Sequence, residues 1–186
     1  NNTELNFTYT LVSKDSIKLH KVLKPFGVYF NGNISGDIAN TSGKFTSTTK
    51  LDIKEFTLQD TAIVVKNLKT DFVFNNEYTN GINGIEIQLN ALGDKISFGS
   101  NTFDSIQTNY SMHGSDAEIQ FRAGMDTSAN AIVHGQLNFG NGSIKADLDT
   151  VLLTYAGYDI ENKGNWIFSF EEADKILRAQ NEFLKS

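Results

Sequence analysis

The sequence predicts an all-β chain whose strands follow one another in a single antiparallel meander, about ten to twelve strands in all. Apolar and polar residues alternate in short runs, and a period of two is the pattern of strands with one buried face. Asn-Gly dipeptides interrupt the pattern, and this pair accepts the positive φ angles of tight hairpin turns. With 1 Pro in 186 residues, the backbone can form long, uninterrupted ladders of hydrogen bonds.

The composition separates the chain from several functional classes. Asn, Ser and Thr together account for 50 of 186 residues, beside 14 Phe. The net charge is -6, the wrong sign for binding phosphate, so nucleic acid is not an expected partner. The absence of Cys excludes a disulfide scaffold, a thiolate zinc site and a cysteine nucleophile. No run approaches the roughly 18 apolar residues of a membrane-spanning helix.

The alternating runs define the expected strands and their apolar face. In chain order, the residues expected on that face are Val28, Phe30, Ile34 and Ile38; Phe45, Ser47, Thr49, Leu51 and Ile53; Leu68, Thr70, Phe72 and Phe74; Ile85, Ile87 and Leu89; Ile106, Thr108, Tyr110 and Met112; Ala117, Ile119 and Phe121; Leu137 and Phe139; Ile144, Ala146 and Leu148; Val151, Leu153 and Tyr155; and Trp166, Phe168 and Phe170.

The positions between them are mostly Thr, Ser, Asn, Lys and Asp, as residues 50–54 and 145–149 illustrate. One sheet that is wet on one side and apolar on the other therefore follows. Hairpin turns are expected at Asn31-Gly32, Asn80-Gly81, Asn83-Gly84 and Asn141-Gly142.

Two stretches depart from this alternation. Residues 15–25 place apolar side chains at helical spacing and end at Pro25, so one short helix is expected there. The tail, residues 169–186, begins with a capping-box pattern at Ser169 and Glu172, and residues 171–184 are rich in helix formers, but the apolar residues also alternate. A helix and a final strand are both compatible with the tail.

Alternation alone does not say whether the apolar face is covered. Two sheets packed face to face, or one sheet closed into a barrel, would bury the phenylalanines in a sealed core. A single curved sheet would leave them lining an open groove. Both arrangements are compatible with the sequence.

No local motif predicts an enzyme, a metal site or a bound cofactor. The sequence contains no Gly-x-Ser-x-Gly, no phosphate-binding Gly-rich loop and no His-Glu-x-x-His. A metal site would need His113 and His134 close together with a carboxylate such as Asp116. Asp147 and Asp149 are too few ligands for calcium. Ordinary positions on the polar face of strands explain all five residues.

Three segments of the chain carry the sequence patterns of a degenerate repeating unit. The run from Val22 to Ile38 joins an apolar helix end to the strand Gly32-Asn33-Ile34-Ser35-Gly36. Val65-Lys66-Asn67-Leu68-Lys69-Thr70-Asp71-Phe72 places Val, Leu, Asp and Phe in a second pattern, and residues 158–170 look like a further strand pair. These patterns resemble the degenerate repeating units of the TamB and AsmA-like family.

The resemblance implies a β-taco, a U-shaped half-pipe of antiparallel strands with an apolar concave face. Proteins of that family cross the bacterial periplasm, are anchored in the inner membrane by an N-terminal helix and work with an outer-membrane barrel of the Omp85 type. They are tied to lipid movement and to assembly of outer-membrane proteins. Residues 1–186 are then expected to be one β-rich segment of such a protein, with phospholipid or β-strand clients in its groove.

The groove needs no catalytic residue, no metal and no cofactor, because shielding acyl chains from water is its whole task. The expected lining consists of Val28, Phe30, Ile34, Phe45, Leu51, Ile53, Phe72, Phe74, Ile85, Ile87, Leu89, Ile119, Phe121, Leu137, Phe139, Leu148, Trp166 and Phe168. The alternative from another class is a cell-surface β-sandwich module that binds or adheres through its loops.

Overall fold

The computed structural model describes residues 4–13, 21–58, 63–99, 101–125, 129–140, 142–155, 157–162, 164–171 and 176–181. Within these ranges the chain forms twelve strands and two short 3₁₀ helices. The strands are β1 Leu5–Val12, β2 Val28–Thr41, β3 Lys44–Leu58, β4 Ile63–Glu77, β5 Ile85–Phe98, β6 Asn101–His113, β7 Asp116–Met125, β8 Ala129–Gly140, β9 Ser143–Tyr155, β10 Tyr158–Glu161, β11 Trp166–Glu171 and β12 Ile176–Asn181.

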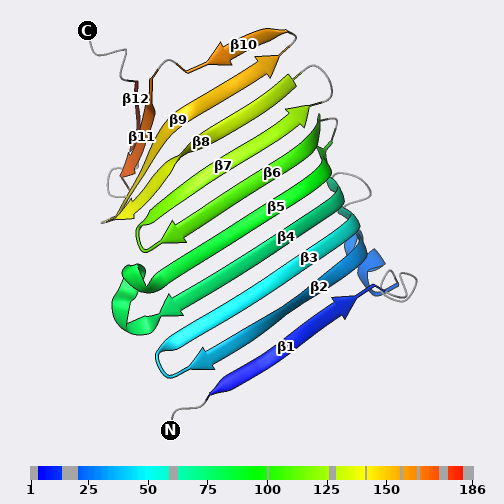
Figure 1. Ribbon diagram of the computed structural model, residues 1–186. Helices are drawn as coiled ribbons and strands as arrows, with labels where there is room; N and C mark the ends of the chain where they lie inside the picture. Colours follow the sequence, from blue (N-terminus) through cyan, green and yellow to red (C-terminus); the bar gives the residue numbers. More distant parts are fainter. Residues whose placement is uncertain are drawn as a thin grey trace.

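All twelve strands belong to one antiparallel sheet. From β1 to β9 each strand pairs with the next one in the chain, which gives the meander in Figure 1. β9 then pairs with both β10 and β11, and β12 lies beyond β11. The predicted all-β meander is confirmed, and the sandwich or barrel that the sequence also allowed does not form in the described sheet.

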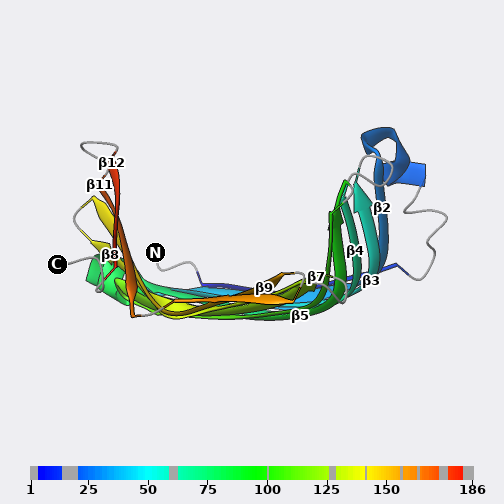
Figure 2. The same cartoon turned by 90° about the horizontal axis from the view of Figure 1, so that it is seen from above.

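The sheet is curved into a U, seen along the stack of strands in Figure 2. Lys54, Asn67, Asp94 and Ser105 have no ladder partner and lie side by side across β3 to β6. All four are exposed, and Asn67 and Ser105 have φ angles of 49° and 52°. Asn67 Nδ2 also donates a hydrogen bond of 2.8 Å to Asp94 Oδ2. Irregular pairing of this kind bends strands, so this row marks a fold line.

The pairing register assigns each strand residue to a face, because directly opposed residues project to the same side. One row on the apolar face runs Phe7, Ile38, Ser47, Phe74, Ile87, Met112, Ala117, Leu137, Ala146, Phe168 and Ala179. The rows two positions to either side belong to this face as well. Among the paired residues assigned to it there is no Asp, Glu, Lys, Arg or His.

The apolar face is the concave one. Phe30 and Ile53 are among the most buried residues of the described chain, and Ala123 is only 2% exposed. All three lie on the apolar face close to the fold line. A Cβ at Gly93 would lie 3.5 Å from Leu68 Cδ1. The low exposure of Phe30, Ile53 and Ala123 in a sheet without a second layer places this face on the inside of the bend.

No second layer covers this face in the described structure, and the surface area reflects it. The chain exposes 12402 Å². A compact monomer of the same mass, 20.6 kDa, would expose about 8,900 Å². No large side chain is fully buried among the described residues. The apolar face is therefore not covered by a second layer in the described sheet, and this face is referred to below as the apolar trough.

Three local predictions have different outcomes. A short helix near the N-terminus is present: residues 21–23 are helical and the 3₁₀ helix Lys24–Phe26 follows, while residues 14–20 lie outside the described ranges. In the tail, β12 is a strand, and the helix that the sequence also allowed is not formed over residues 176–181. Asn31-Gly32 is not a hairpin turn, because it lies inside β2 at the shift in register.

The other Asn-Gly pairs do lie between strands. Residues 80–84 fall in the second 3₁₀ helix, Tyr78–Gly84, which connects β4 to β5. Gly142, with φ of 71°, connects β8 to β9, while Asn141 lies outside the described residues.

Gly36 offers a test of the packing at β1. A Cβ there would overlap the carbonyl oxygen of Thr48 and come within 2.5 Å of Tyr9 Oη, which shares a hydrogen bond of 2.6 Å with Thr49 Oγ1. We expect Gly36→Ala to lower the free energy of unfolding by about 1–3 kcal/mol and to loosen β1. Denaturant unfolding and amide exchange of residues 5–12 measure both effects.

Gly140→Ala is the matched control, because a Cβ at Gly140 meets only Asn138 Oδ1, at 3.6 Å. Equal unfolding midpoints for the two variants would contradict the packing assigned to Gly36.

Candidate functional site

The apolar trough collects all eighteen residues that the sequence predicted as a lining. Pairs such as Phe72 with Leu89 and Phe121 with Val133 place them, strand by strand, on the same face. Val28 and Phe30 lie on the same face as the other lining residues of β2. The extra residue at the register shift between β2 and β3 is Lys54 of β3, so the alternation along β2 is unbroken. The trough is thus built from nearly every strand of the sheet.

The structure also adds residues that the sequence reasoning missed. β1 was not among the expected strands, although Leu5, Phe7, Tyr9 and Leu11 alternate. Beyond the fold line the trough also contains a row formed by Phe56, Val65, Ile96 and Phe103, each paired with the next. At the fold line the apolar positions switch from odd to even numbers or the reverse, as from Ile53 to Phe56. A strict period of two therefore assigns this row to the wrong face.

Aromatic side chains pack against one another along the floor of the trough. The rings of Phe45 and Phe74, diagonal neighbours on β3 and β4, have centroids 5.9 Å apart and are tilted by 59°. At the β11 end, Trp166 and Phe168 stack with centroids 6.0 Å apart. Such contacts stabilise the floor while leaving its upper surface open to a ligand.

The edge of the trough leaves large apolar groups in solvent. Phe7 is 45% exposed, and Leu5 and Leu11 are similarly open. At the other end Leu177 of β12 is 68% exposed.

Tyr110 is the ionisable side chain with a perturbed pKa in the trough. It lies opposite Ile119 and Leu89, and its hydroxyl donates to Met112 Sδ at 3.4 Å. Partial burial raises the pKa of Tyr110 above its ordinary value of 10.0 because the apolar surroundings disfavour the phenolate.

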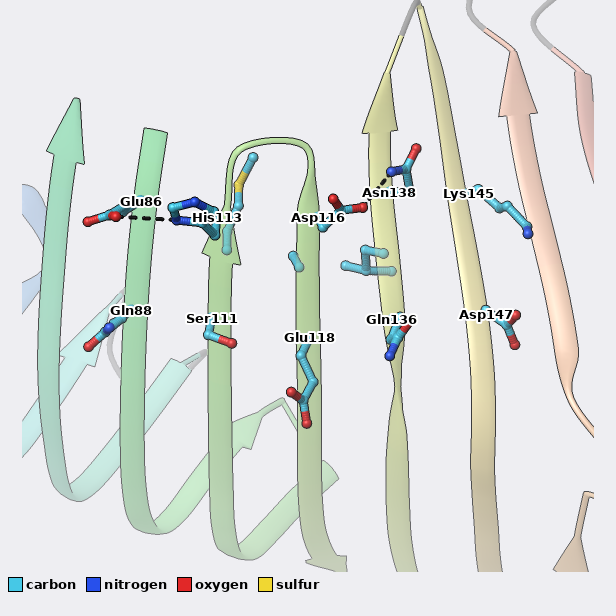
Figure 3. Close-up of a pocket in the computed structure, with 13 residues that line it drawn as sticks. Glu86, Gln88, Ser111, His113, Asp116, Glu118, Gln136, Asn138, Lys145 and Asp147 are labelled. Carbon is cyan, nitrogen blue, oxygen red and sulfur yellow. Dashed lines mark hydrogen bonds and ion pairs between the residues drawn. The ribbon is translucent and has the colours of Figure 1, made fainter. Parts of the chain in front are cut away.

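The convex face is polar and carries the charges. A shallow hollow of about 490 Å³ lies on it over β5 to β9. Figure 3 shows its side chains, among them the cross-strand row Gln88, Ser111, Glu118, Gln136 and Asp147. This face carries the polar side chains, while the opposite face carries the apolar ones.

The two described histidines lie on the polar face with different partners. His113 Nδ1 lies 3.2 Å from Glu86 Oε1. His134 lies between two carboxylates, with Nδ1 2.7 Å from Asp149 Oδ1 and Nε2 3.0 Å from Glu118 Oε1. Sequence reasoning considered these histidines as a shared metal site, but they do not converge on a common carboxylate.

The carboxylate partners define the chemistry open to these histidines. Both rings bind carboxylates rather than a hydroxyl, so neither is arranged as a base for a Ser or Thr nucleophile. Among the described residues, no group of three or more His, Asp or Glu side chains has an arrangement suited to a metal ion.

Comparisons with known proteins do not assign the chain to a family. No family profile, no curated protein and no solved structure matches it. In the part of the chain that the structure describes, no helix is long and apolar enough to cross a membrane.

Tyr110 provides a spectroscopic test of the trough. We expect the difference in phenolate absorbance between the wild-type chain and Tyr110→Phe to titrate with a midpoint above 10.0, because partial burial disfavours the charged form. In denaturant the midpoint should return to the ordinary value. A folded-state midpoint at or below 10.0 would mean that Tyr110 is fully hydrated.

Proposed function

We propose that the chain is a segment of a TamB/AsmA-like envelope protein and that its apolar trough holds the acyl chains of phospholipids moving through the periplasm between the two membranes. The observation that carries the proposal is one continuous apolar face, free of charged paired residues and with no second layer over it. The sequence resemblance described above supplies the family and the cellular setting.

The dimensions of the trough suit acyl chains. Eleven strands lie side by side in the main path of the sheet. Ten spacings of about 4.8 Å between strands give a trough about 48 Å long. The hydrocarbon part of one membrane leaflet is about 15 Å thick, half of the bilayer core. A lipid tail therefore fits along the floor with room to move from strand to strand.

The energetics also favour this use. Moving an acyl chain through water costs about 0.8 kcal/mol for each exposed methylene group. A continuous apolar floor removes most of that cost at every step, and its paired residues include no charged side chain that would hold the ligand. Charged headgroups would remain in water outside the trough, because burying a charge without a partner is unfavourable.

The test uses a matched pair of substitutions on neighbouring residues that face opposite sides. Phe121 lies on the trough, opposed to Thr108 and Val133, whereas Gln120 lies on the polar face, opposed to Asn109 and His134. We expect Phe121→Glu to lower binding of phospholipid about tenfold or more, because it places an unpaired charge on the apolar floor. Gln120→Glu should leave binding unchanged.

Native mass spectrometry of the purified chain, followed by titration with a fluorescent phospholipid, measures the effect. Phe72→Glu and Val73→Glu form a second pair, since these apolar neighbours also lie on opposite faces. Equal lipid binding by all four variants, with unchanged thermal unfolding, would exclude the trough as the lipid site.

A photoreactive residue at Phe45 distinguishes the two ligands that the family resemblance implies. Phe45 lies on the trough floor beside Phe74. Crosslinking to phospholipid supports the lipid conduit, whereas crosslinking only to an unfolded outer-membrane β-barrel protein would replace it with a role in the assembly of such clients.

A further inference from the structure

β9 changes partners along one edge, and the change occurs at an irregularity. Residues 143–148 of β9 pair with β11, whereas residues 152–155 pair with β10. On its other edge β9 pairs with β8, where His134 opposes Thr150 but Gly135 opposes Leu148. Asp149 is therefore an extra residue at the junction between the two halves of β9.

The side chain of Asn162 fixes the backbone of β9 at this junction. Asn162 Nδ2 donates to the carbonyl oxygen of Asp149 at 2.9 Å, and Asn162 Oδ1 accepts from the Val151 amide at 2.7 Å. On the inside, a Cβ at Gly135 would lie 2.5 Å from the Asp147 carbonyl oxygen, so this position requires glycine. The bulge is thus a fixed local structure.

His134 connects the bulge to the rest of the sheet. Its imidazole, on β8, reaches Asp149 of β9 through Nδ1, 2.7 and 2.8 Å from the two carboxylate oxygens. Nε2 reaches Glu118 of β7 at 3.0 Å. Both ring nitrogens can donate at once only when the imidazole is protonated. The cationic ring therefore joins three strands at the point where β9 divides.

The other charged groups near the ring are few. From β7 the same face presents Arg122 and Asp116 in addition to Glu118, and from β9 it presents Asp147 and Lys145 in addition to Asp149. Asp159 and Glu161 lie on β10 beyond β9. Gln120 and Thr150, the residues directly opposite His134, are uncharged. No cation contacts either carboxylate in competition with the ring among the described residues.

We propose that His134, Glu118 and Asp149 form a proton-dependent clamp that holds the β9 bulge and so controls how firmly β11 and β12 are attached to the sheet. β11 carries Trp166 and Phe168, which lie on the apolar face at the β11 end of the trough, and it pairs with β9 up to Leu148, the residue before the bulge. Loss of the clamp above neutral pH should loosen that end of the trough.

The direction of the pH effect follows from the three pKa shifts. Hydrogen bonds to Glu118 and Asp149 raise the pKa of His134 above its ordinary 6.5. The hydrogen bond from His134 lowers the pKa of Glu118 below 4.5 and that of Asp149 below 3.8. The histidine contribution is complete below pH 6.5 and fades as the pH rises through its raised pKa. The carboxylate contributions fade only in acid, below those ordinary values.

The experiment compares the wild-type chain with His134→Gln by amide exchange of residues 166–171. At any one pH the intrinsic exchange rates are the same for both proteins, so their ratio reports the clamp alone. At about pH 5.5 we expect the wild type to exchange on the order of two- to fivefold more slowly, the range of partly exposed ion pairs. At about pH 9 the ratio should approach one, because neutral His134 has lost the clamp.

His113→Gln is the matched control, because His113 lies on the same face with one carboxylate partner and is 79% exposed. It should leave exchange of β11 unchanged at both pH values. A two-dimensional NMR titration of the imidazoles adds a direct measurement: His134 should titrate above 6.5, and Asp149→Asn should lower its midpoint.

Two results would overturn the proposal. One is a His134 midpoint at or below 6.5 in the folded chain. The other is an exchange ratio for β11 that is the same in acid and in base. If His134→Gln fails to fold, Asp149→Asn replaces it in the exchange experiment, since the amide keeps the shape of the side chain at the bulge. Neither result depends on lipid binding, so the proposal stands or fails separately from the conduit.

Discussion

A single-layer sheet with one apolar face has to reduce its exposed apolar surface without a second layer, and bending is the available means. Unpaired residues on β3 to β6, such as Asn67 and Ser105, are placed side by side, so several strands bend along one line. Phe30 and Ile53, close to this line on the apolar face, are among the most buried residues of the described chain. Curvature, the small core and the trough are thus consequences of the same row of unpaired residues.

The need to keep one face of the sheet apolar also determines the composition of the polar face. Because every charge is excluded from the paired positions of the trough, charged side chains gather on the convex side and meet across strands. Most of those pairs, such as Lys50 with Asp71 at 3.9 Å, are exposed and contribute little. His134 differs because two carboxylates from two strands share one ring beside a bulge.

The period-two pattern predicted the strands and their faces well, because a slip of one residue would turn every Phe outward. It did not predict the bend, since Asn67 and Ser105 look like ordinary polar positions in a strand. Asn adopts positive φ more often than most residues, but the chain has 20 Asn, so a single Asn within a strand does not mark a bend. Phe56 and Val65 are missing from the predicted lining because the alternation changes at these unpaired residues. The clamp was missed because Glu118 and Asp149 are separated from His134 by 16 and 15 residues, and only the meander brings them together.

The absence of a second layer links folding to ligand binding. In a closed sandwich the apolar face is satisfied by the protein itself, whereas here much of it remains in water even in the folded chain. An acyl chain on the floor would act as the missing layer and gain the free energy that a second sheet would otherwise supply, about 0.8 kcal/mol for each buried methylene. Because an unfolded chain offers no such floor, any ligand of the trough also stabilises the curved sheet.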